Sequence, residues 1–514
     1  MGEVTADRPD HVVVVLLDSL NRHLLGAYGS SEFETPHLDA FARQSIVFDR
    51  HHAGSLPCMP ARHDLLVGSL DFPWRPWGSI EIWEDAITRD LRRAGVTTML
   101  ISDHPHLFEV GGENYHTDFT AWEYTRGHEN DPWRTVEDST WCGSPALPVA
   151  RNPRAHFHYD TTRTWFRDET DFPGPATMRT AAAWIRNNAG RHAKSFLLVD
   201  EFDPHEPFDT PEPWASKYRK DVDDPWLIWP PYAVDAVAKG VLTEAEARSL
   251  RAAYGAKLSM IDHWFGELMR AIDESPDAER TAVVVCTDHG HYLGERGVWG
   301  KPAHPIHDPL GHIPLMIRWP GAASRRTRRL TTTVDVHATL CDVFGVEPAH
   351  RTHGRSLIPV VESDASVRDA VLSGYWGREV LLVTDDVSYT RGSVGSGFPL
   401  SMWSNRWSTM PIHARPDIRL PLPDARARLD RMPGSNVPVI RQPFVEGDLL
   451  PFWAYGGLVD SNLLYDRNED PEQLVNLADS GRESKLESES MEILRHELLG
   501  IEAPDDLMER LGLA

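Results

Sequence analysis

Short runs of β-branched and other apolar residues alternate with helix-like stretches along the first 300 residues. Four runs define the pattern: 12–18 (VVVVLLD), 96–103 (VTTMLISD), 195–203 (SFLLVDEFD) and 281–290 (TAVVVCTDHG). Apolar runs of this length, separated by helical segments, are typical of buried parallel strands covered by helices. The pattern therefore predicts an α/β fold with a large, mostly parallel sheet sandwiched by helices.

The clearest helix is predicted between the last two strands. Thr243 and Glu246 have the spacing of a capping box, in which each side chain bonds the backbone N–H of the other residue. The following stretch, EARSLRAAYGAKLSMIDHWFGELMRAID, repeats apolar residues at helical spacing. We expect one continuous crossover helix here.

The pattern changes near residue 370. SGYWGREVLLVTDDVSYTRG predicts strand, turn and strand, and Pro-rich loops follow. The last 32 residues, from ESKLESES onward, form an amphipathic helical stretch that could pack on its own chain or against a second subunit in a homo-oligomer. We therefore expect a large domain over residues 1–370 and a smaller C-terminal α+β domain over 371–514 with a helical tail.

Charge and cysteine content narrow the partners and the compartment. The formal net charge of −25 disfavours nucleic acid and anionic membranes as partners, so an anionic ligand must meet a local cationic site. The run VVVVLL is too short for a signal core or a membrane span, and no basic segment precedes it. The cysteines show no paired spacing, which fits a reducing compartment: Cys58, Cys142, Cys286 and Cys341. We expect a cytoplasmic protein.

Each of the four predicted strands ends in an aspartate. The carboxyl ends of parallel strands lie at one edge of a sheet, where ligands gather in open α/β folds. Aspartate is also common in turns and at helix N-termini, so no single position is diagnostic. The set predicts an acidic rim made of Asp18, Asp103, Asp203 and Asp288.

The segment GSLPCMPARHDLLVGSL places Cys58 just before a proline able to open a helix, with Arg62 one turn further on. This arrangement favours an anion at the cysteine. The residues alone allow either a thiolate nucleophile or a buried structural cysteine. The thiolate is the weaker interpretation, because neither a Gly-rich anion loop nor a histidine base at a familiar spacing accompanies the cysteine.

The order of residues at this cysteine resembles the Cys-Xaa-Pro-Xaa-Arg element that directs oxidation of cysteine to formylglycine in sulfatases. It consists of Cys58, Met59, Pro60, Ala61 and Arg62. Ala61 stands where Ser or Thr is more frequent in that family. The longer stretch ETPHLDAFARQSIVFDRHHAGSLPCMPARHDLLVGSL is similar to the sulfatase segment that leads to the modified residue, and HIPLMIRWPG, TTTVDVHATLCDVFGV, HGRSLIPV and LYDRNEDPEQLVNLA extend the resemblance.

This resemblance to the sulfatase branch of the alkaline phosphatase superfamily implies an alkaline phosphatase-like fold. It also implies hydrolysis of a small-molecule sulfate ester by formylglycine at position 58, made by a formylglycine-generating enzyme, with one divalent metal ion, Ca²⁺ or Mn²⁺. Asp18, Asp288 and His289 would bind the metal. The family usually has two adjacent acidic or amide ligands at the first motif, so Asn21, Ser19 or water would complete the set here.

The resemblance also assigns roles around the transferred anion. Arg62 would hold the hydrated aldehyde, Lys301 in GERGVWGKP would contact the sulfate, and His205 in FDPHEPF would protonate the leaving oxygen. His104 and His106 in ISDHPHLF lie where sulfatases have a Lys and His pair. Without the resemblance, each would be read as a solvated lysine or a hydrogen-bonded loop histidine, since the chain has 25 histidines.

Two other functions stay open at this point. Asp288 and His289 also resemble the pair in phosphonate monoester hydrolases, so a phosphonate or phosphodiester is the alternative substrate. A non-catalytic binding protein on the same fold is the third possibility, because fold alone does not define activity. The segment WSTMPIHARPDI is similar to part of a bacterial sulfatase group, and this resemblance implies that His413 or Arg415 reaches the edge of the active site.

Overall fold

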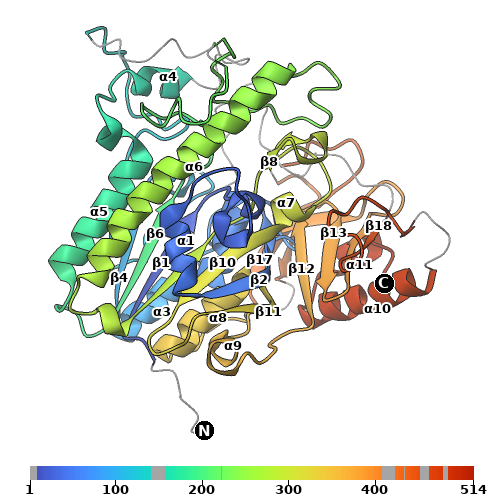
Figure 1. The fold of residues 1–514 in the computed structure, drawn as a ribbon. Coiled ribbons are helices and arrows are strands. Elements are labelled where there is room, and N and C mark those ends of the chain that lie inside the picture. The colour runs from blue at the N-terminus through green and yellow to red at the C-terminus, as the bar shows by residue number, and fades with distance from the viewer. Residues whose placement is uncertain are drawn as a thin grey trace.

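A computed structural model describes residues 8–140, 157–221, 223–407, 423–432, 435–451, 462–478 and 484–514. Its centre is an eight-stranded sheet of order β11-β2-β10-β7-β1-β6-β4-β5 (Figure 1). All neighbouring strands are parallel except β10, which runs antiparallel to both β2 and β7. The strands are β1 (His11–Leu17), β2 (Ile46–His52), β4 (Thr97–Ser102), β5 (Ala121–Tyr124), β6 (Ser195–Glu201), β7 (Thr281–Cys286), β10 (His312–Arg318) and β11 (Arg325–Thr332). The predicted mostly parallel α/β sheet is confirmed.

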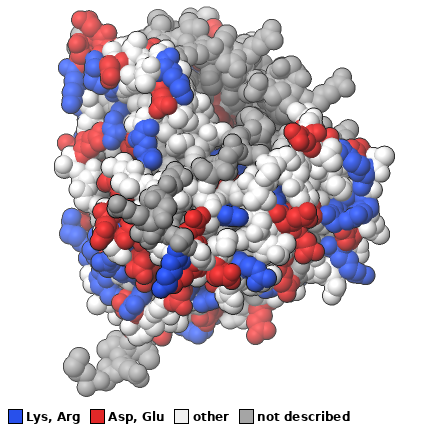
Figure 2. Space-filling view, turned by 90° about the vertical axis from the view of Figure 1, so that its right-hand side faces the viewer, with Lys and Arg blue, Asp and Glu red and all other residues white. Residues whose placement is uncertain are grey.

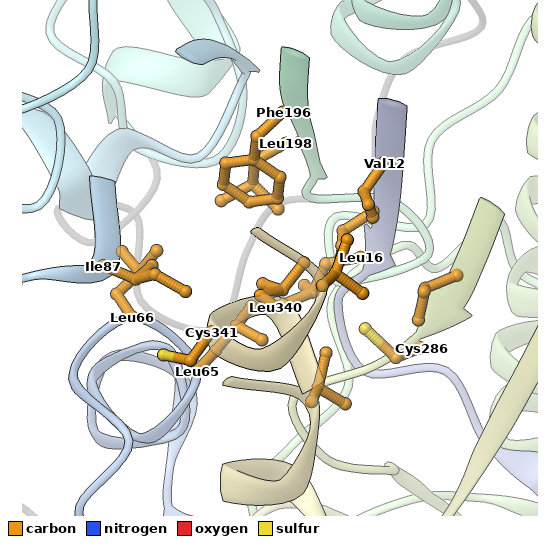
Figure 3. Close-up of a cluster of buried hydrophobic side chains, with 14 of the residues drawn as sticks. Val12, Leu16, Leu65, Leu66, Ile87, Phe196, Leu198, Cys286, Leu340 and Cys341 are labelled. Carbon is orange, nitrogen blue, oxygen red and sulfur yellow. The ribbon is translucent and has the colours of Figure 1, made fainter. Parts of the chain in front are cut away.

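Helices cover both faces of this sheet, which explains why its strands are apolar on both sides. One face packs against α2 (Cys58–Val67), α3 (Ile87–Arg93), α8 (Thr333–Phe344) and α9 (Ile358–Ser363). The other face packs against α1 (Pro36–Arg43), α5 (Pro173–Asn188) and α6 (Glu244–Asp273). Figure 3 shows the first core, which contains Val12, Leu16, Leu65, Leu66 and Leu340.

The long crossover helix α6 forms as predicted. The Thr243 side chain accepts a hydrogen bond from the Glu246 backbone N–H, and the Glu246 carboxylate accepts one from the Thr243 N–H. These bonds satisfy backbone donors that have no partner inside the helix. Over its 30 residues α6 packs beside α5 and α1, and its buried side chains line the second core.

A smaller five-stranded sheet, of order β18-β14-β13-β12-β3, lies beside the main one. Its C-terminal strands are β12 (Ala370–Tyr375), β13 (Val380–Thr384), β14 (Val387–Arg391) and β18 (Leu463–Asp466), so the predicted strand, turn and strand are confirmed. Its edge strand β3 (Ser55–Leu56) comes from the segment just ahead of Cys58 and pairs parallel with β12. The C-terminal segment therefore forms four of the five strands of this second sheet, and the boundary at residue 370 stays a prediction.

The C-terminal helices α10 (Ser484–Gly500) and α11 (Asp505–Arg510) pack on the smaller sheet. Leu494, Leu498 and Leu507 share one apolar cluster with Leu372 and Tyr389. The C-terminal helical stretch was predicted to pack on its own chain or against a second subunit. In the structure it packs on its own chain. Both signs of charge are interspersed on the face shown in Figure 2.

Short elements complete the described part of the chain. They are β8 (Tyr292–Leu293), β9 (Trp299–Gly300), β15 (Leu400–Ser404), β16 (Arg428–Arg431), β17 (Pro438–Phe444), α4 (Phe157–Arg163), α7 (Asp308–Gly311), η1 (Arg22–Leu24), η2 (Gly26–Tyr28), η3 (Pro105–Phe108), η4 (Glu169–Asp171), η5 (Ala278–Arg280) and η6 (Glu295–Gly297). Among the described helices, none has the length and apolar character needed to cross a bilayer.

Candidate active site

The carboxyl edge of the main sheet brings together four buried side chains from distant parts of the sequence. Asp18 follows β1, Asp288 and His289 follow β7, and Cys58 is the first residue of α2. One potential ligand atom from each of the four lies within 4.8 Å of the others. Parallel strands explain this convergence, because β1 and β7 end at the same edge.

Cys58 is the first residue of α2, so the helix begins two residues before Pro60, the proline expected to open it. Its Sγ lies 3.2 Å from His289 Nε2 and 3.7 Å from Lys301 Nζ. Burial and the nearby Asp18 carboxylate raise the pKa of the thiol well above its ordinary value, and the Lys301 ammonium offsets this only in part. This environment disfavours a thiolate, so the thiolate interpretation gains no support from the structure.

Arg62 lies one turn into α2 and ties the acidic residues together. Its Nε and Nη2 donate to the two carboxylate oxygens of Asp200 at 2.8 and 2.7 Å. Its Nη1 donates to Asp288 at 2.9 Å, and Nη2 lies 3.0 Å from Asp18. Although burial lowers it, these three carboxylates hold the pKa of the guanidinium well above its ordinary value.

Asp200 did not emerge from the sequence. It lies inside the apolar run of β6, beside Leu16 at the end of β1. An ionisable residue within an otherwise apolar strand was the available signal, because a buried charge needs a partner. Its bidentate pairing with Arg62 fixes the guanidinium beneath Cys58.

The charges and donor atoms of the group fit a divalent cation. Asp18, Asp200 and Asp288 outnumber Arg62 and Lys301 by one charge if all five are ionised. Asp18 Oδ2 is buried and accepts no hydrogen bond within the described chain, although Arg62 Nη2 lies 3.0 Å from it. Carboxylate oxygens together with an imidazole nitrogen suit Mn²⁺ and also accommodate Ca²⁺.

His289 has the tautomer that a metal ligand needs. Its Nδ1 lies 2.8 Å from the Gly290 carbonyl oxygen, so this nitrogen donates and Nε2 keeps its lone pair toward Cys58. Burial lowers the pKa of His289 to about 3, which keeps the ring neutral. A neutral imidazole is the form that binds metal.

Ser19, rather than Asn21, lies next to the four-residue group. Ser19 N donates to Asp288 Oδ1 at 3.1 Å, and Ser19 Oγ donates to Asp18 Oδ1 at 2.7 Å. The Asn21 amide is used elsewhere: Oδ1 accepts from His23 N at 2.9 Å and Nδ2 donates to the His291 carbonyl at 2.8 Å. The Asn21 side chain therefore does not lie with the other predicted metal ligands, Asp18, Asp288 and His289.

Lys301 and His205 are two further buried residues of the site. Lys301 Nζ donates to Ser19 Oγ at 3.3 Å. Although burial lowers it, the nearby carboxylates of Glu206, Asp18 and Asp288 raise the pKa of Lys301. His205 Nδ1 lies 2.7 Å from the Glu206 carbonyl oxygen and donates to it. Burial lowers the pKa of His205 to about 3, so the predicted role as proton donor requires a bound anion to raise that pKa.

The two histidines of ISDHPHLF differ in charge state. His104 is fully buried with Nε2 at 3.6 Å from Asp18 Oδ2, and burial holds its pKa well below the ordinary value. His106 lies between Glu109 and Glu129, and its Nε2 is 3.2 Å from Glu129. Although burial lowers it, these carboxylates raise the pKa of His106 to about 10.

Further polar residues near the site had no clear signal in the sequence. Tyr232 donates its hydroxyl to Glu206 Oε1 at 2.5 Å, and His291 Nε2 lies 3.2 Å from Glu206 Oε2. Glu206 adjoins His205 in FDPHEPF, which was the available clue, whereas Tyr232 and Glu129 come from loops without a motif. His413, Arg415 and Cys142 lie outside the described residues.

The sheet, the acidic edge and the cysteine at a helix N-terminus define a class, namely the hydrolases with an alkaline phosphatase-like fold. The phosphonate monoester hydrolase of Agrobacterium radiobacter superposes with a TM-score of 0.65 at 17% identity, covering 96% of this chain and 95% of that one. A multifunctional alkaline phosphatase superfamily protein of Trinickia caryophylli is 25% identical over 394 residues, covering 66% of this chain and 73% of its own.

Within that class, residues 10–346 match the sulfatase family. The choline-sulfatase of Rhizobium meliloti is 26% identical over 389 residues, which cover 70% of this chain and 72% of the relative. The chain belongs to the sulfatase family of sulfuric ester hydrolases.

Proposed function

We propose that this protein hydrolyses small-molecule sulfate esters through residue 58, oxidised from cysteine to formylglycine. The observation that carries the proposal is the group Asp18, Cys58, Asp288 and His289, with Arg62 one helical turn behind the cysteine. The cysteine and the arginine belong to the Cys-Xaa-Pro-Xaa-Arg element, and a formylglycine-generating enzyme would be the maturation partner. The cytoplasmic location stays a prediction.

The same group would bind one divalent ion, Ca²⁺ or Mn²⁺. Asp18, Asp288 and His289 are the protein ligands, and an oxygen at position 58 would replace the thiol. The neutral imidazole of His289 favours Mn²⁺. When bound, the ion polarises a sulfuryl oxygen and stabilises an anionic nucleophile at neutral pH.

The side chains around position 58 divide the remaining tasks. As a hydrated aldehyde, residue 58 supplies the attacking oxygen and, through its second hydroxyl, the route for sulfate release. Arg62 is fixed by Asp200 and donates to the Cys58 carbonyl oxygen at 3.2 Å, so it orients the residue. Lys301, 3.7 Å from Cys58 Sγ, can meet the negative charge on the transferred group. His205 would protonate the leaving oxygen once the bound anion has raised its pKa.

The second candidate is hydrolysis of phosphonate monoesters or phosphodiesters by the same residues. It is favoured by the Asp288 and His289 pair and by the likeness to the phosphonate monoester hydrolase and the multifunctional relative. Rates on an aryl sulfate, a phosphodiester and a phosphonate monoester separate the two. Dominant phosphodiesterase activity would contradict the sulfatase proposal.

The first test combines modification and turnover. The protein is produced with a formylglycine-generating enzyme, and the peptide containing residue 58 is analysed by mass spectrometry. We expect the aldehyde at position 58 and aryl sulfate turnover that Cys58→Ala abolishes. Cys341→Ala, at another buried cysteine, is the matched control and should retain turnover. An unmodified Cys58 in a fully active preparation would overturn the mechanism, and turnover by neither protein would favour a non-catalytic binding role.

A further inference from the structure

One phenylalanine that the chemistry proposed above does not use is in contact with the histidines around the site. Phe202 directly follows β6 and is completely buried. Its ring centroid lies 4.2 Å from that of His205, 4.3 Å from His104, 4.6 Å from His128 and 6.1 Å from His106. These histidines follow three neighbouring parallel strands, β4, β5 and β6. The Phe202 ring is therefore a shared contact of three loops at the carboxyl edge of the main sheet.

The surroundings of Phe202 are unusual for a buried phenylalanine. Among the described residues, Phe202 belongs to none of the apolar clusters that fill the molecule. A phenyl ring is normally buried against apolar side chains, from which most of its contribution to stability comes. Here imidazole rings pack on it instead. Core packing alone does not explain a phenyl ring in this position.

The contact between Phe202 and His205 is a face-to-face stack. The two ring planes lie within 15° of parallel at a centroid distance of 4.2 Å. A local turn produces the stack, because the His205 backbone N donates to the Phe202 carbonyl oxygen at 2.9 Å and so brings the two side chains together. A ring packed flat against a fixed neighbour cannot turn about its Cβ–Cγ bond, since the turn would drive its atoms into that neighbour. Phe202 therefore sets the plane of the His205 ring.

One edge of the His205 ring is held as well. Nδ1 donates to the Glu206 carbonyl oxygen at 2.7 Å and lies 3.5 Å from the Glu206 carboxylate. This contact decides which ring nitrogen holds the ring and which one is left to face a substrate. With its face against Phe202 and Nδ1 on Glu206, the ring presents Nε2 in one direction.

Phe202 is itself fixed by the ends of neighbouring strands. Its backbone N donates to Asp103 Oδ1 at 2.8 Å. The rings of His104 and His128 cross its ring plane at 75° and 71°, and His128 Nε2 is tied to the Asp203 carboxylate at 2.7 Å. Both the backbone and the ring of Phe202 therefore have partners from other loops. The ring is a fixed support that does not have to move with His205.

A proton donor must lie within about 2.6–3.2 Å of the leaving oxygen, and a displacement of about 1 Å can lower the rate about 100-fold. We propose that Phe202 is a positioning residue, whose ring fixes the plane of the His205 imidazole so that Nε2 meets the leaving oxygen of the sulfate ester. This inference rests on the proposed function. A weakly basic leaving group departs without a proton, so the effect of Phe202 should grow with the basicity of the leaving group.

The turnover test compares two aryl sulfates of similar shape. Phenyl sulfate releases the more basic phenoxide, and 4-nitrophenyl sulfate releases the less basic one. Phe202→Leu should lower kcat/KM of the mature enzyme about 10- to 100-fold on phenyl sulfate, but less than about threefold on 4-nitrophenyl sulfate. Equal losses on the two esters would overturn the inference.

Two further variants keep this test decisive. Phe196→Leu, at a buried phenylalanine on β6 itself, is the matched control and should change kcat/KM on both esters by the same factor. Phe202→Met keeps more of the side-chain volume and replaces Phe202→Leu if the leucine variant does not fold. We expect it to show the same unequal losses on the two esters, and equal losses would again overturn the inference.

A double-mutant cycle shows whether Phe202 acts through His205. His205→Ala removes the proton donor, so its effect should already include most of the loss that Phe202→Leu causes. In the His205→Ala background we expect Phe202→Leu to lower kcat/KM on phenyl sulfate less than about twofold. A loss there as large as in the otherwise wild-type enzyme would show that the two residues act independently, and it would overturn the inference.

A spectroscopic test separates this inference from the proposed function. Histidine that is isotope-labelled at the ring Cε1 gives an NMR signal for each ring, and His205→Ala identifies the signal of residue 205. We expect one narrow signal in the wild-type and Phe196→Leu proteins and a broadened or doubled signal in Phe202→Leu, which supports positioning even if no sulfate ester is turned over. A single narrow signal in Phe202→Leu contradicts positioning, and turnover of 4-nitrophenyl sulfate would in that case leave the sulfatase function intact.

Discussion

Arg62 is the residue on which the charges of the site converge. It contacts three carboxylates from three strand ends, and it is almost fully buried. A buried ion group of this kind keeps a single arrangement, because removing any member leaves an uncompensated charge in a poorly solvated place. Loss of the arginine should therefore disturb both the position of residue 58 and the stability of the fold.

Lys301 should matter for turnover and little for folding. Lys301→Ala removes the ammonium that faces the transferred group, and loss of one such charge-stabilising contact typically lowers kcat by about 100- to 1,000-fold. Steady-state rates on an aryl sulfate and urea unfolding measure the two effects. Lys239→Ala, at an exposed lysine, is the control. Turnover within threefold of wild type in Lys301→Ala would contradict the role.

The pair of His106 and Glu129 gives stability a defined dependence on pH. The pKa of His106 is raised to about 10, so its contribution is fully present below the unfolded-state pKa of 6.5 and is lost as pH rises toward 10. Glu129→Gln removes one of the two carboxylates, so the free energy of unfolding should fall less steeply between pH 7 and 9.5 than in wild type. Urea unfolding across this range measures the slope. An unchanged slope would show that Glu129 does not hold the imidazolium.

Some residues of the candidate site could be predicted from the sequence, and others could not. Asp18, Asp288, His289 and Cys58 stand at strand ends or in a motif, and the fold brings them together. Asp200, Glu129 and Tyr232 carry no local signal, because their importance depends on which distant residues they meet. A pattern read along the chain cannot supply such a contact.

At the scale of elements, α6 connects the two loops of the candidate metal site. Tyr254 lies on α6, about one turn after Arg251. Its hydroxyl donates to the Ser19 carbonyl oxygen at 3.0 Å and accepts from Asn21 N at 2.9 Å. The helix therefore holds the backbone that follows Asp18. Arg251 donates to the Leu293 carbonyl at 2.7 Å and so holds the segment after His291 as well.

Tyr254→Phe should weaken metal binding while keeping the fold. It leaves two buried backbone groups without their partner, at a cost of roughly 1–3 kcal/mol, and loosens the loop that carries Asp18. Loss of an outer contact of this kind typically lowers metal affinity about 10- to 100-fold. Mn²⁺ titration measures it. Tyr218→Phe, whose hydroxyl bonds Ser259 elsewhere on α6, is the control, and equal affinity in both variants would refute the link.

The elements themselves followed closely from local pattern. The apolar runs predicted the parallel strands, because strands buried on both faces need apolar residues throughout. The capping box predicted the start of α6, because the first backbone N–H groups of a helix need partners from nearby residues. The antiparallel strand β10 and the pairing of β3 with β12 had no such signal. Both depend on contacts between segments far apart in sequence.

At the scale of the whole molecule, the site holds more carboxylates than cationic side chains. A divalent ion should therefore stabilise the folded protein, since a ligand that binds only the native state raises its stability. We expect Tm to rise with added Mn²⁺ and to fall with a chelator. Asp18→Asn should remove this response, whereas Asp273→Asn, at an exposed position, should keep it. A Tm independent of Mn²⁺ in wild type would contradict the metal site.

The pairing of β3 with β12 has a consequence for how the enzyme is made. Strand β3 ends at Leu56, two residues before Cys58, and its partner lies more than 300 residues later, at Gly374 and Tyr375. In the folded chain only 3% of Cys58 is exposed. If a second enzyme oxidises residue 58 as proposed, the reaction would have to precede burial of this segment in the folded chain. A chain that folds first would keep an unmodified cysteine, so the order of folding and oxidation, and not only the supply of the maturation enzyme, would set the active fraction.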